Sequence, residues 1–187
     1  MWGRTKPSNL CAMPMIDLTY PQGALTPAAR ASAIERLTAA FLRHEGAADN
    51  DATRSMSRAF VHELPADAIY IGGRLDDRPT YRLLLTAPAG TLLHGPGPFA
   101  AEARRSLVRE ATEILLDAEG SEPAPGDPGR VYCIIAEVAD GFWGGLGTTF
   151  RMEDIVAFAN PQAEQTPVAQ QARKALAAAG LEPAHAT

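Results

Sequence analysis

A proline that could take part in acid–base chemistry follows a methionine at Met13-Pro14, directly before an apolar stretch. If Met13 were the first translated residue and were then removed, Pro14 would carry a free secondary amine. An α-amine titrates at about 8, below lysine, and an apolar enclosure lowers its pKa further because desolvation disfavours the ammonium form. Such a nitrogen can take a proton from a carbon beside a carbonyl and return it elsewhere. Pro14 is therefore the candidate catalytic residue.

The segment 1–13 stands against this role, since a preceding residue turns the Pro14 nitrogen into a tertiary amide without basicity. Two explanations stay open. Either translation starts at Met13 and the leader is absent from the mature protein, or the leader is retained and the site is inactive, activated by proteolysis or differently catalysed. The leader shows no periodicity, which favours the first explanation. Pro14 could also simply begin an edge strand, a common place for proline.

The remaining polar residues give weaker signals. His62 and Glu63 are neighbours on a predicted strand, so their side chains point to opposite faces and form no dyad. Arg82 lies on another predicted strand, where it could project into a cavity or pair with an acid. The four histidines and two cysteines show no metal-ligand spacing, and no phosphate-binding loop occurs. The sequence therefore predicts no metal and no cofactor.

Bulk composition excludes several classes of protein. Lys and Arg number 17 against 22 Asp and Glu, and no basic stripe occurs, which disfavours nucleic acid as a partner. The longest apolar runs are too short for a membrane span, and the first residues lack the apolar core of a signal peptide. Two cysteines, Cys11 and Cys133, suit a reducing compartment. We expect a cytoplasmic protein without a membrane partner.

The elements that would position these residues follow a repeated order. Residues 15–20 alternate as a half-buried strand, and Thr26 caps a helix from Pro27 to Gly46. A polar connection over 47–53 leads to a second strand over 58–64. This order is typical of a β-α-β unit.

The same order then returns. A strand is predicted over 81–86, and Gly97-Pro98 opens a helix that reaches Ala118. A connection rich in glycine and proline over 120–129 leads to a strand over 131–138.

We therefore predict an α+β fold with a single domain over 14–150, built from units 14–73 and 79–150. Two tandem β-α-β units can join into one four-stranded mixed sheet with two helices on one face. The other face would carry Phe60, Ile134 and Cys133, and such an uncovered apolar face favours an oligomer.

Residues 151–187 are predicted to form an appendage outside this domain. Its helix would run from Thr166-Pro167 to about Ala179, and it is poor in large apolar residues.

Three motifs resemble the tautomerase superfamily. They are PMIDLTYPQG after Met13, with LTPAAR behind it, SRAFVHELPADAIYIGG over Ser57–Gly73, and RVYCIIAEVADGFWGGLG over Arg130–Gly147. The last is similar to the C-terminal half of 4-oxalocrotonate tautomerase. The double-length arrangement resembles the cis-3-chloroacrylic acid dehalogenase and malonate semialdehyde decarboxylase branches, which are trimers.

The resemblance implies roles for particular residues. Pro14 matches the catalytic N-terminal proline, and Arg58 matches the arginine that meets the substrate carboxylate, a task that suits a planar fork. Tyr132 occupies the matching position of the second half, and Trp143 matches an aromatic pocket wall. Arg58 could instead be a surface arginine in an ion pair, and Trp143 an interface tryptophan.

The sequence also departs from the family pattern. The stretch LLLTAPAGTLLHG lacks the paired arginines of the dehalogenases and the decarboxylase, and the dehalogenase's water-activating glutamate is replaced within GFWGGLG. The helix-borne histidine of the cis enzyme aligns with Phe41, although His44 lies nearby. These departures disfavour hydration of a haloacrylate and leave proton transfer in an enol or keto acid compatible.

The sequence thus predicts a cofactor-independent tautomerase, an isomerase acting on a small carbonyl acid as a homotrimer. Pro14 would be general base and then acid, Arg58 the carboxylate anchor, and Tyr132, Trp143 and Arg82 further substrate-binding residues. A related decarboxylase or a biosynthetic cyclase on the same site is an alternative. Another is a catalytically inactive trimeric binding or scaffold protein whose leader blocks Pro14.

Overall fold

The computed structural model describes residues 13–89, 91, 93, 97–121, 124–145, 147–151 and 154–155. The leader and the helix expected from Thr166 lie outside these residues, so both stay predictions, as does the division of the chain at residue 150. Among the described helices, none is long and apolar enough to cross a membrane.

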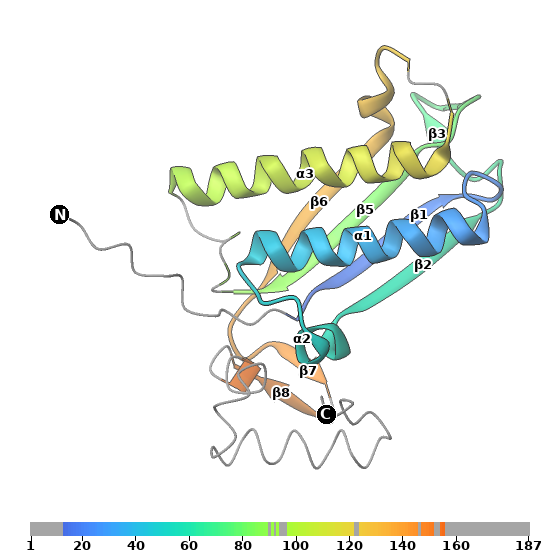
Figure 1. The fold of residues 1–187 in the computed structure, drawn as a ribbon. Coiled ribbons are helices and arrows are strands. Elements are labelled where there is room, and N and C mark those ends of the chain that lie inside the picture. The colour runs from blue at the N-terminus through green and yellow to red at the C-terminus, as the bar shows by residue number, and fades with distance from the viewer. Residues whose placement is uncertain are drawn as a thin grey trace.

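The described chain contains four long strands, two long helices and several short elements (Figure 1). In chain order they are β1 (Met15–Pro21), α1 (Pro27–Glu45), α2 (Asp51–Met56), β2 (Arg58–Leu64), β3 (Tyr70–Ile71), β4 (Arg74–Leu75), β5 (Tyr81–Pro88), α3 (Pro98–Glu119), the 3-10 helix η1 (Asp127–Arg130), β6 (Val131–Val138), β7 (Trp143–Gly145) and β8 (Thr148–Phe150).

The long strands form one mixed sheet in the order β2-β1-β5-β6. Each β-α-β unit supplies a parallel pair, β1 with β2 and β5 with β6. The two units join through β1 and β5, which run antiparallel with Ile16 opposite Leu85 and Leu18 opposite Leu83. The predicted α+β fold with a four-stranded mixed sheet is confirmed.

Both long helices cover the same face of this sheet, as predicted (Figure 1). Alternate residues of β1 and β5 are buried beneath them, because successive side chains of a strand point to opposite faces. The helices contribute apolar residues at helical spacing. The largest members of this core are Ile16, Leu18, Tyr20, Leu37, Phe41, Tyr81, Leu83, Leu85, Leu107 and Leu115.

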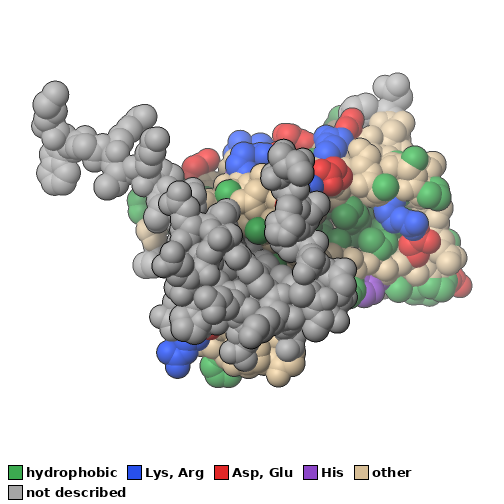
Figure 2. All heavy atoms as spheres, turned by 60° about the horizontal axis from the view of Figure 1, so that its bottom comes forward, with side chains coloured by type: hydrophobic (Ala, Val, Ile, Leu, Met, Phe, Trp, Pro, Cys, Tyr) green, Lys and Arg blue, Asp and Glu red, His purple; other side chains and the backbone are tan. Residues whose placement is uncertain are grey.

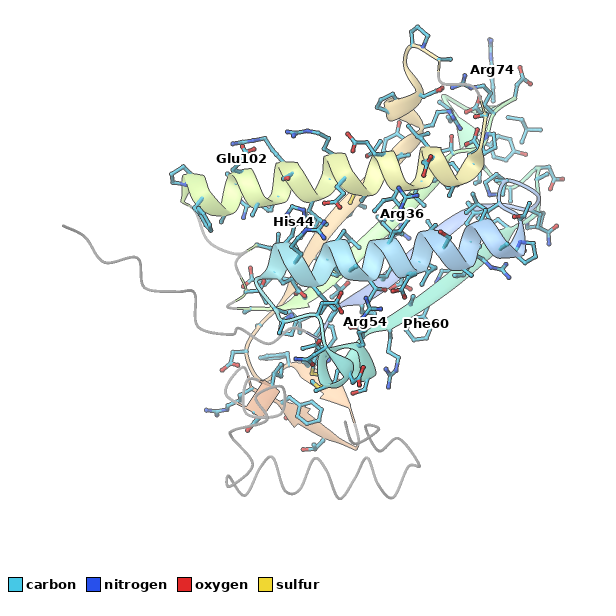
Figure 3. All side chains as sticks on the ribbon, viewed as in Figure 1. Arg36, His44, Arg54, Phe60, Arg74 and Glu102 are labelled. Atoms are coloured by element: carbon cyan, nitrogen blue, oxygen red, sulfur yellow. The ribbon has the colours of Figure 1, made fainter. Side chains whose placement is uncertain are left out.

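Ion pairs join α1 to α3 above that core. Arg36 pairs with Asp117, whereas Arg43 and His44 both pair with Glu110, so the two helices run antiparallel. Figure 3 shows Arg36 and His44 on the side of α1 that points toward α3. His44 is therefore a residue of the helix interface.

No described helix covers the opposite face of the sheet, also as predicted. Phe60, Tyr132 and Ile134 are 48%, 57% and 47% exposed there. The expectation for Cys133 is wrong: it alternates with Tyr132 and Ile134 and packs against the core beneath the helices. Burial raises the pKa of the Cys133 thiol to about 12, so it is an inert core residue.

One short helix and two short hairpins form where the sequence predicted connections or strand ends. Helix α2 forms where the polar stretch 47–53 was expected to connect α1 to β2, and a reciprocal capping arrangement between Asn50 and Thr53 starts it. Beyond β2 and β6, the glycine pairs lie in two antiparallel hairpins, β3-β4 and β7-β8.

One buried acid has no partner among the described residues. Glu45, the last residue of α1, is fully buried, and no described residue forms a hydrogen bond with either of its carboxylate oxygens. Desolvation raises the pKa of this carboxyl well above its ordinary value near 4.5, because burial disfavours the charged form. Because the pKa of Glu45 is higher in the folded than in the unfolded state, Glu45 favours folding most below its unfolded-state pKa. The free energy of unfolding then falls as the pH rises toward its folded-state pKa.

We predict that Glu45→Met, which keeps a long side chain without a polar end, raises the free energy of unfolding at neutral pH by about 1–3 kcal/mol. The gain should be larger at pH 8 than at pH 5, because the raised pKa makes the cost of burying the Glu45 carboxyl grow with pH above its unfolded-state pKa. Urea denaturation at both pH values measures it. Glu113→Met, on an exposed part of α3, is the control. An equal gain at both pH values would contradict the prediction.

Candidate functional site

A cavity of about 470 Å³ lies at the end of the sheet where β1 and β2 begin and β6 ends. The uncovered sheet face forms its floor, and α2 and the β7-β8 hairpin form its walls. Its described lining residues are Met13, Pro14, Met15, Ser55, Met56, Arg58, Phe60, Val138, Phe142, Trp143, Gly144, Gly145, Phe150, Asp154 and Ile155. Most of these side chains are apolar.

Pro14 is buried in this cavity directly before β1. Its carbonyl oxygen accepts a hydrogen bond of 3.0 Å from the backbone N–H of Arg58, which extends the pairing of β1 with β2 by one position. This bond fixes the proline and the arginine beside each other. In the described chain Met13 precedes Pro14, so the ring nitrogen is an amide nitrogen there.

The end of α2 orients the side chain of Arg58. The Nη1 atom of Arg58 donates hydrogen bonds to the carbonyl oxygens of Ser55 at 2.6 Å and of Ser57 at 2.8 Å. Ser55 lies in the last turn of α2 and Ser57 directly after it, where carbonyl groups have no partner within the helix. No described residue bonds Nε or Nη2, which leaves two donor atoms of the planar fork for an anion.

Arg54 fastens α2 itself to the preceding part of the chain. It pairs with Glu35 of α1 at 2.8 Å and with Asp49 in the connection. Those two hydrogen bonds raise the pKa of the Arg54 guanidinium, and Arg54 lowers the pKa of the Asp49 carboxyl. Figure 3 shows Arg54 on α2 beneath α1. The helix that holds Arg58 is thereby held by α1.

Aromatic residues of the β7-β8 hairpin and its approach form the opposite wall. Trp143 is 8% exposed and pairs with Phe150 across the hairpin, whereas Phe142 is largely exposed at the rim. The Phe150 ring lies over Gly145, where an added Cβ would sit 3.1 Å from it. Figure 2 brings forward the lower side of Figure 1, and hydrophobic side chains gather there beside the atoms drawn in grey.

Tyr132 and Arg82 do not reach this cavity in the single chain. They pair with each other at the start of β5 and β6 and line a different hollow with Tyr70 and Ile71 of β3. Tyr132 lies six positions before Val138 on β6, which is about 20 Å along a strand. The structure thus brings Pro14, Arg58 and Trp143 together and separates Tyr132 and Arg82 from them.

The sequence analysis missed several residues of the cavity. Met56 and Ser55 arrive there because α2 forms, and a weak signal for α2 exists in the capping pattern of Asn50 and Thr53. Asp154 and Ile155 lie beyond the predicted domain, and Ile155 is 1% exposed. No local pattern marks Asp154, because only the tertiary fold places it in the lining of the same cavity as Pro14.

The described part of the chain contains no group of three or more His, Cys, Asp or Glu side chains that could hold a metal ion.

Several solved structures resemble this chain in fold. No protein-family model and no curated protein matches the sequence. Among solved structures, N1, a member of the cis-3-chloroacrylic acid dehalogenase family, has 16% identity and a TM-score of 0.57 over 83% of this chain and 99% of its own. The F6 fused 4-OT, an asymmetric trimer, has 23% identity and a TM-score of 0.54 over 72% and 94%.

A macrophage migration inhibitory factor-like protein from Entamoeba histolytica has 14% identity and a TM-score of 0.54 over 74% of this chain and 99% of its own. The chain therefore spans nearly the whole length of each of these proteins. At such identities the likeness shows a shared fold, which agrees with the resemblance drawn from the sequence motifs.

The geometry predicts that Arg58 binds a carboxylate in this cavity. Arg58→Ala should weaken phenylacetate binding by about ten- to a hundredfold, since hydrogen bonds to charged groups contribute about 1.5–3 kcal/mol. The chain has two tryptophans, so Trp143 fluorescence in a Trp2→Phe background reports binding. Arg82→Ala is the matched control and should leave the Kd unchanged. An equal loss in both variants would refute the assignment of Arg58.

Proposed function

We propose that this chain, whose fold is that of the tautomerase superfamily, is a cofactor-independent tautomerase that moves a proton in an enol or keto acid. One observation carries the proposal: Pro14 and Arg58 are joined by a backbone hydrogen bond inside a largely apolar cavity. A proton-transferring nitrogen and a carboxylate anchor would then lie at a fixed separation. Substrate positioning of this kind is a major source of rate enhancement.

Each part of the cavity would have a chemical role once Pro14 carries a free amine. Arg58 would hold the substrate carboxylate through Nε and Nη2, while Ser55 and Ser57 keep its Nη1 in place. The apolar walls, Trp143 among them, would keep the pKa of the amine low, so that the neutral base dominates near pH 7. The amine would take the enol hydroxyl proton and return a proton to carbon.

The lining also favours a particular kind of substrate. Among its described residues the cavity contains one cation, Arg58, and one anion, Asp154, against walls formed by Met56, Phe60 and Trp143. A second carboxylate would therefore lack a counter-charge and would meet Asp154. A monocarboxylate with an apolar body fits this lining better than a dicarboxylate.

We predict that a protein beginning at Pro14 ketonises phenylenolpyruvate faster than 2-hydroxymuconate. Pro14→Ala in that protein should lower kcat/KM at least about a hundredfold, the usual contribution of a positioned acid–base group. Absorbance of the enol measures both rates. Rates that are equal for Pro14 and Pro14→Ala would remove proline as the base. Decarboxylation or cyclisation on the same site would appear as a different product by NMR.

An oligomer is the second part of the proposal. Phe60, Tyr132 and Ile134 leave apolar surface on the uncovered sheet face, and the similar F6 fused 4-OT is a trimer. We propose that this face packs against further copies of the chain in a homotrimer. A binding or scaffold protein would share this assembly and lack the activity.

Ile134→Glu should shift the protein from trimer toward monomer in analytical ultracentrifugation, because it places a charge on the apolar sheet face that the proposed trimer would bury. Phe99→Glu is the control, since Phe99 is an exposed apolar residue on α3. The proposal fails if the wild-type protein sediments as a monomer or if both variants behave alike.

A further inference from the structure

The candidate site contains a carboxylate that the proline mechanism does not use. Of the described residues that line the cavity, Arg58 and Asp154 alone carry ionisable side chains. The remainder are apolar residues, glycines and one serine. Asp154 is therefore the acid–base group that the lining offers apart from Pro14.

The backbone around Asp154 holds its carboxylate in place. Oδ2 accepts a hydrogen bond of 2.8 Å from the backbone N–H of Arg151. The backbone N–H groups of Asp154 and Ile155 in turn donate to the Arg151 carbonyl at 3.0 Å and 3.1 Å. This turn is anchored because Ile155 is 1% exposed. No described residue bonds Oδ1, which leaves one carboxylate oxygen for a bound molecule.

Pro14 and Asp154 differ in what they require to accept a proton. While any residue precedes Pro14, its nitrogen is an amide and has no basicity, and Met13 precedes it in the described chain. A carboxylate accepts a proton whatever stands at the amino terminus.

We infer that Asp154 is a second catalytic acid–base group of this cavity and that it transfers the proton when Pro14 is blocked. The inference rests on the proposed function, since it uses the same cavity and the same Arg58 anchor. The substrate is again an enol or keto acid with one carboxylate.

The transfer balances with Asp154 alone. Its carboxylate takes the enol hydroxyl proton, and the electron pair of the O–H bond becomes the second bond of the new carbonyl. The C=C electron pair then takes the proton from the Asp154 carboxylic acid, which forms a C–H bond and restores the carboxylate. Enol becomes ketone, and no oxidant, reductant or cofactor enters.

The test compares two proteins, the full chain from Met1 and a chain that begins at Pro14, each with and without Asp154→Asn. Asparagine retains an oxygen that can accept the Arg151 N–H, so the turn is kept while the titrating group is lost. Asp67→Asn, in an exposed turn, is the matched control. Phenylenolpyruvate is the substrate, and circular dichroism verifies folding.

In the full chain, Asp154→Asn should lower kcat/KM at least about a hundredfold, whereas Asp67→Asn should leave it unchanged. In the chain beginning at Pro14, Asp154→Asn should lower kcat/KM by a smaller factor than in the full chain, because the Pro14 amine also transfers the proton there. The activity of the Pro14 chain should also fall at acidic pH, as its amine gains a proton.

Two results overturn the inference and leave the proposed function standing. One is an inactive full chain beside an active Pro14 chain, and the other is an active full chain that Asp154→Asn does not slow. If neither chain converts the substrate while both bind phenylacetate, the proposed function fails, and the inference fails with it.

Discussion

The antiparallel pairing of β1 with β5 is the constraint on which the rest of this structure depends. Each half of the chain is a β-α-β unit with a parallel strand pair, and this one pairing joins the halves into a continuous sheet. Because the central strands run in opposite directions, equivalent positions of the two halves lie at opposite ends of the sheet. The internal repeat in the sequence therefore does not bring equivalent residues together.

This geometry explains which candidate residues meet. Arg58 begins β2 and Tyr132 stands at the start of β6, and both face the uncovered side of the sheet. They nevertheless lie at opposite ends, Arg58 beside Pro14 and Tyr132 beside Arg82. At the end of the sheet that contains Pro14, α2 and the β7-β8 hairpin form the walls of the cavity. Helix α2 precedes β2, and the hairpin follows β6.

The structure treats its carboxylates in two ways. Where α1 meets α3, burial by itself would raise the pKa of Glu110, but hydrogen bonds from Arg43 and His44 outweigh this effect and lower it. Glu45 has no partner among the described residues, and burial raises its pKa. In the candidate site, Arg58 has donor atoms and Asp154 has one oxygen that no described residue bonds. Unused polar atoms beside an apolar lining are what a polar ligand requires.

The sequence by itself determined the long elements, their order and the helix-covered face of the sheet, because periodicity and capping residues report local structure and burial. It also identified Pro14, Arg58 and Trp143 as residues of interest through short motifs. Only the tertiary structure decided which of them share a cavity, that Cys133 lies beneath the helices, and that Asp154 lines the same cavity as Pro14. Those placements depend on the relative direction of β1 and β5 and on the path of the chain beyond β6, and neither leaves a local pattern in the residues concerned.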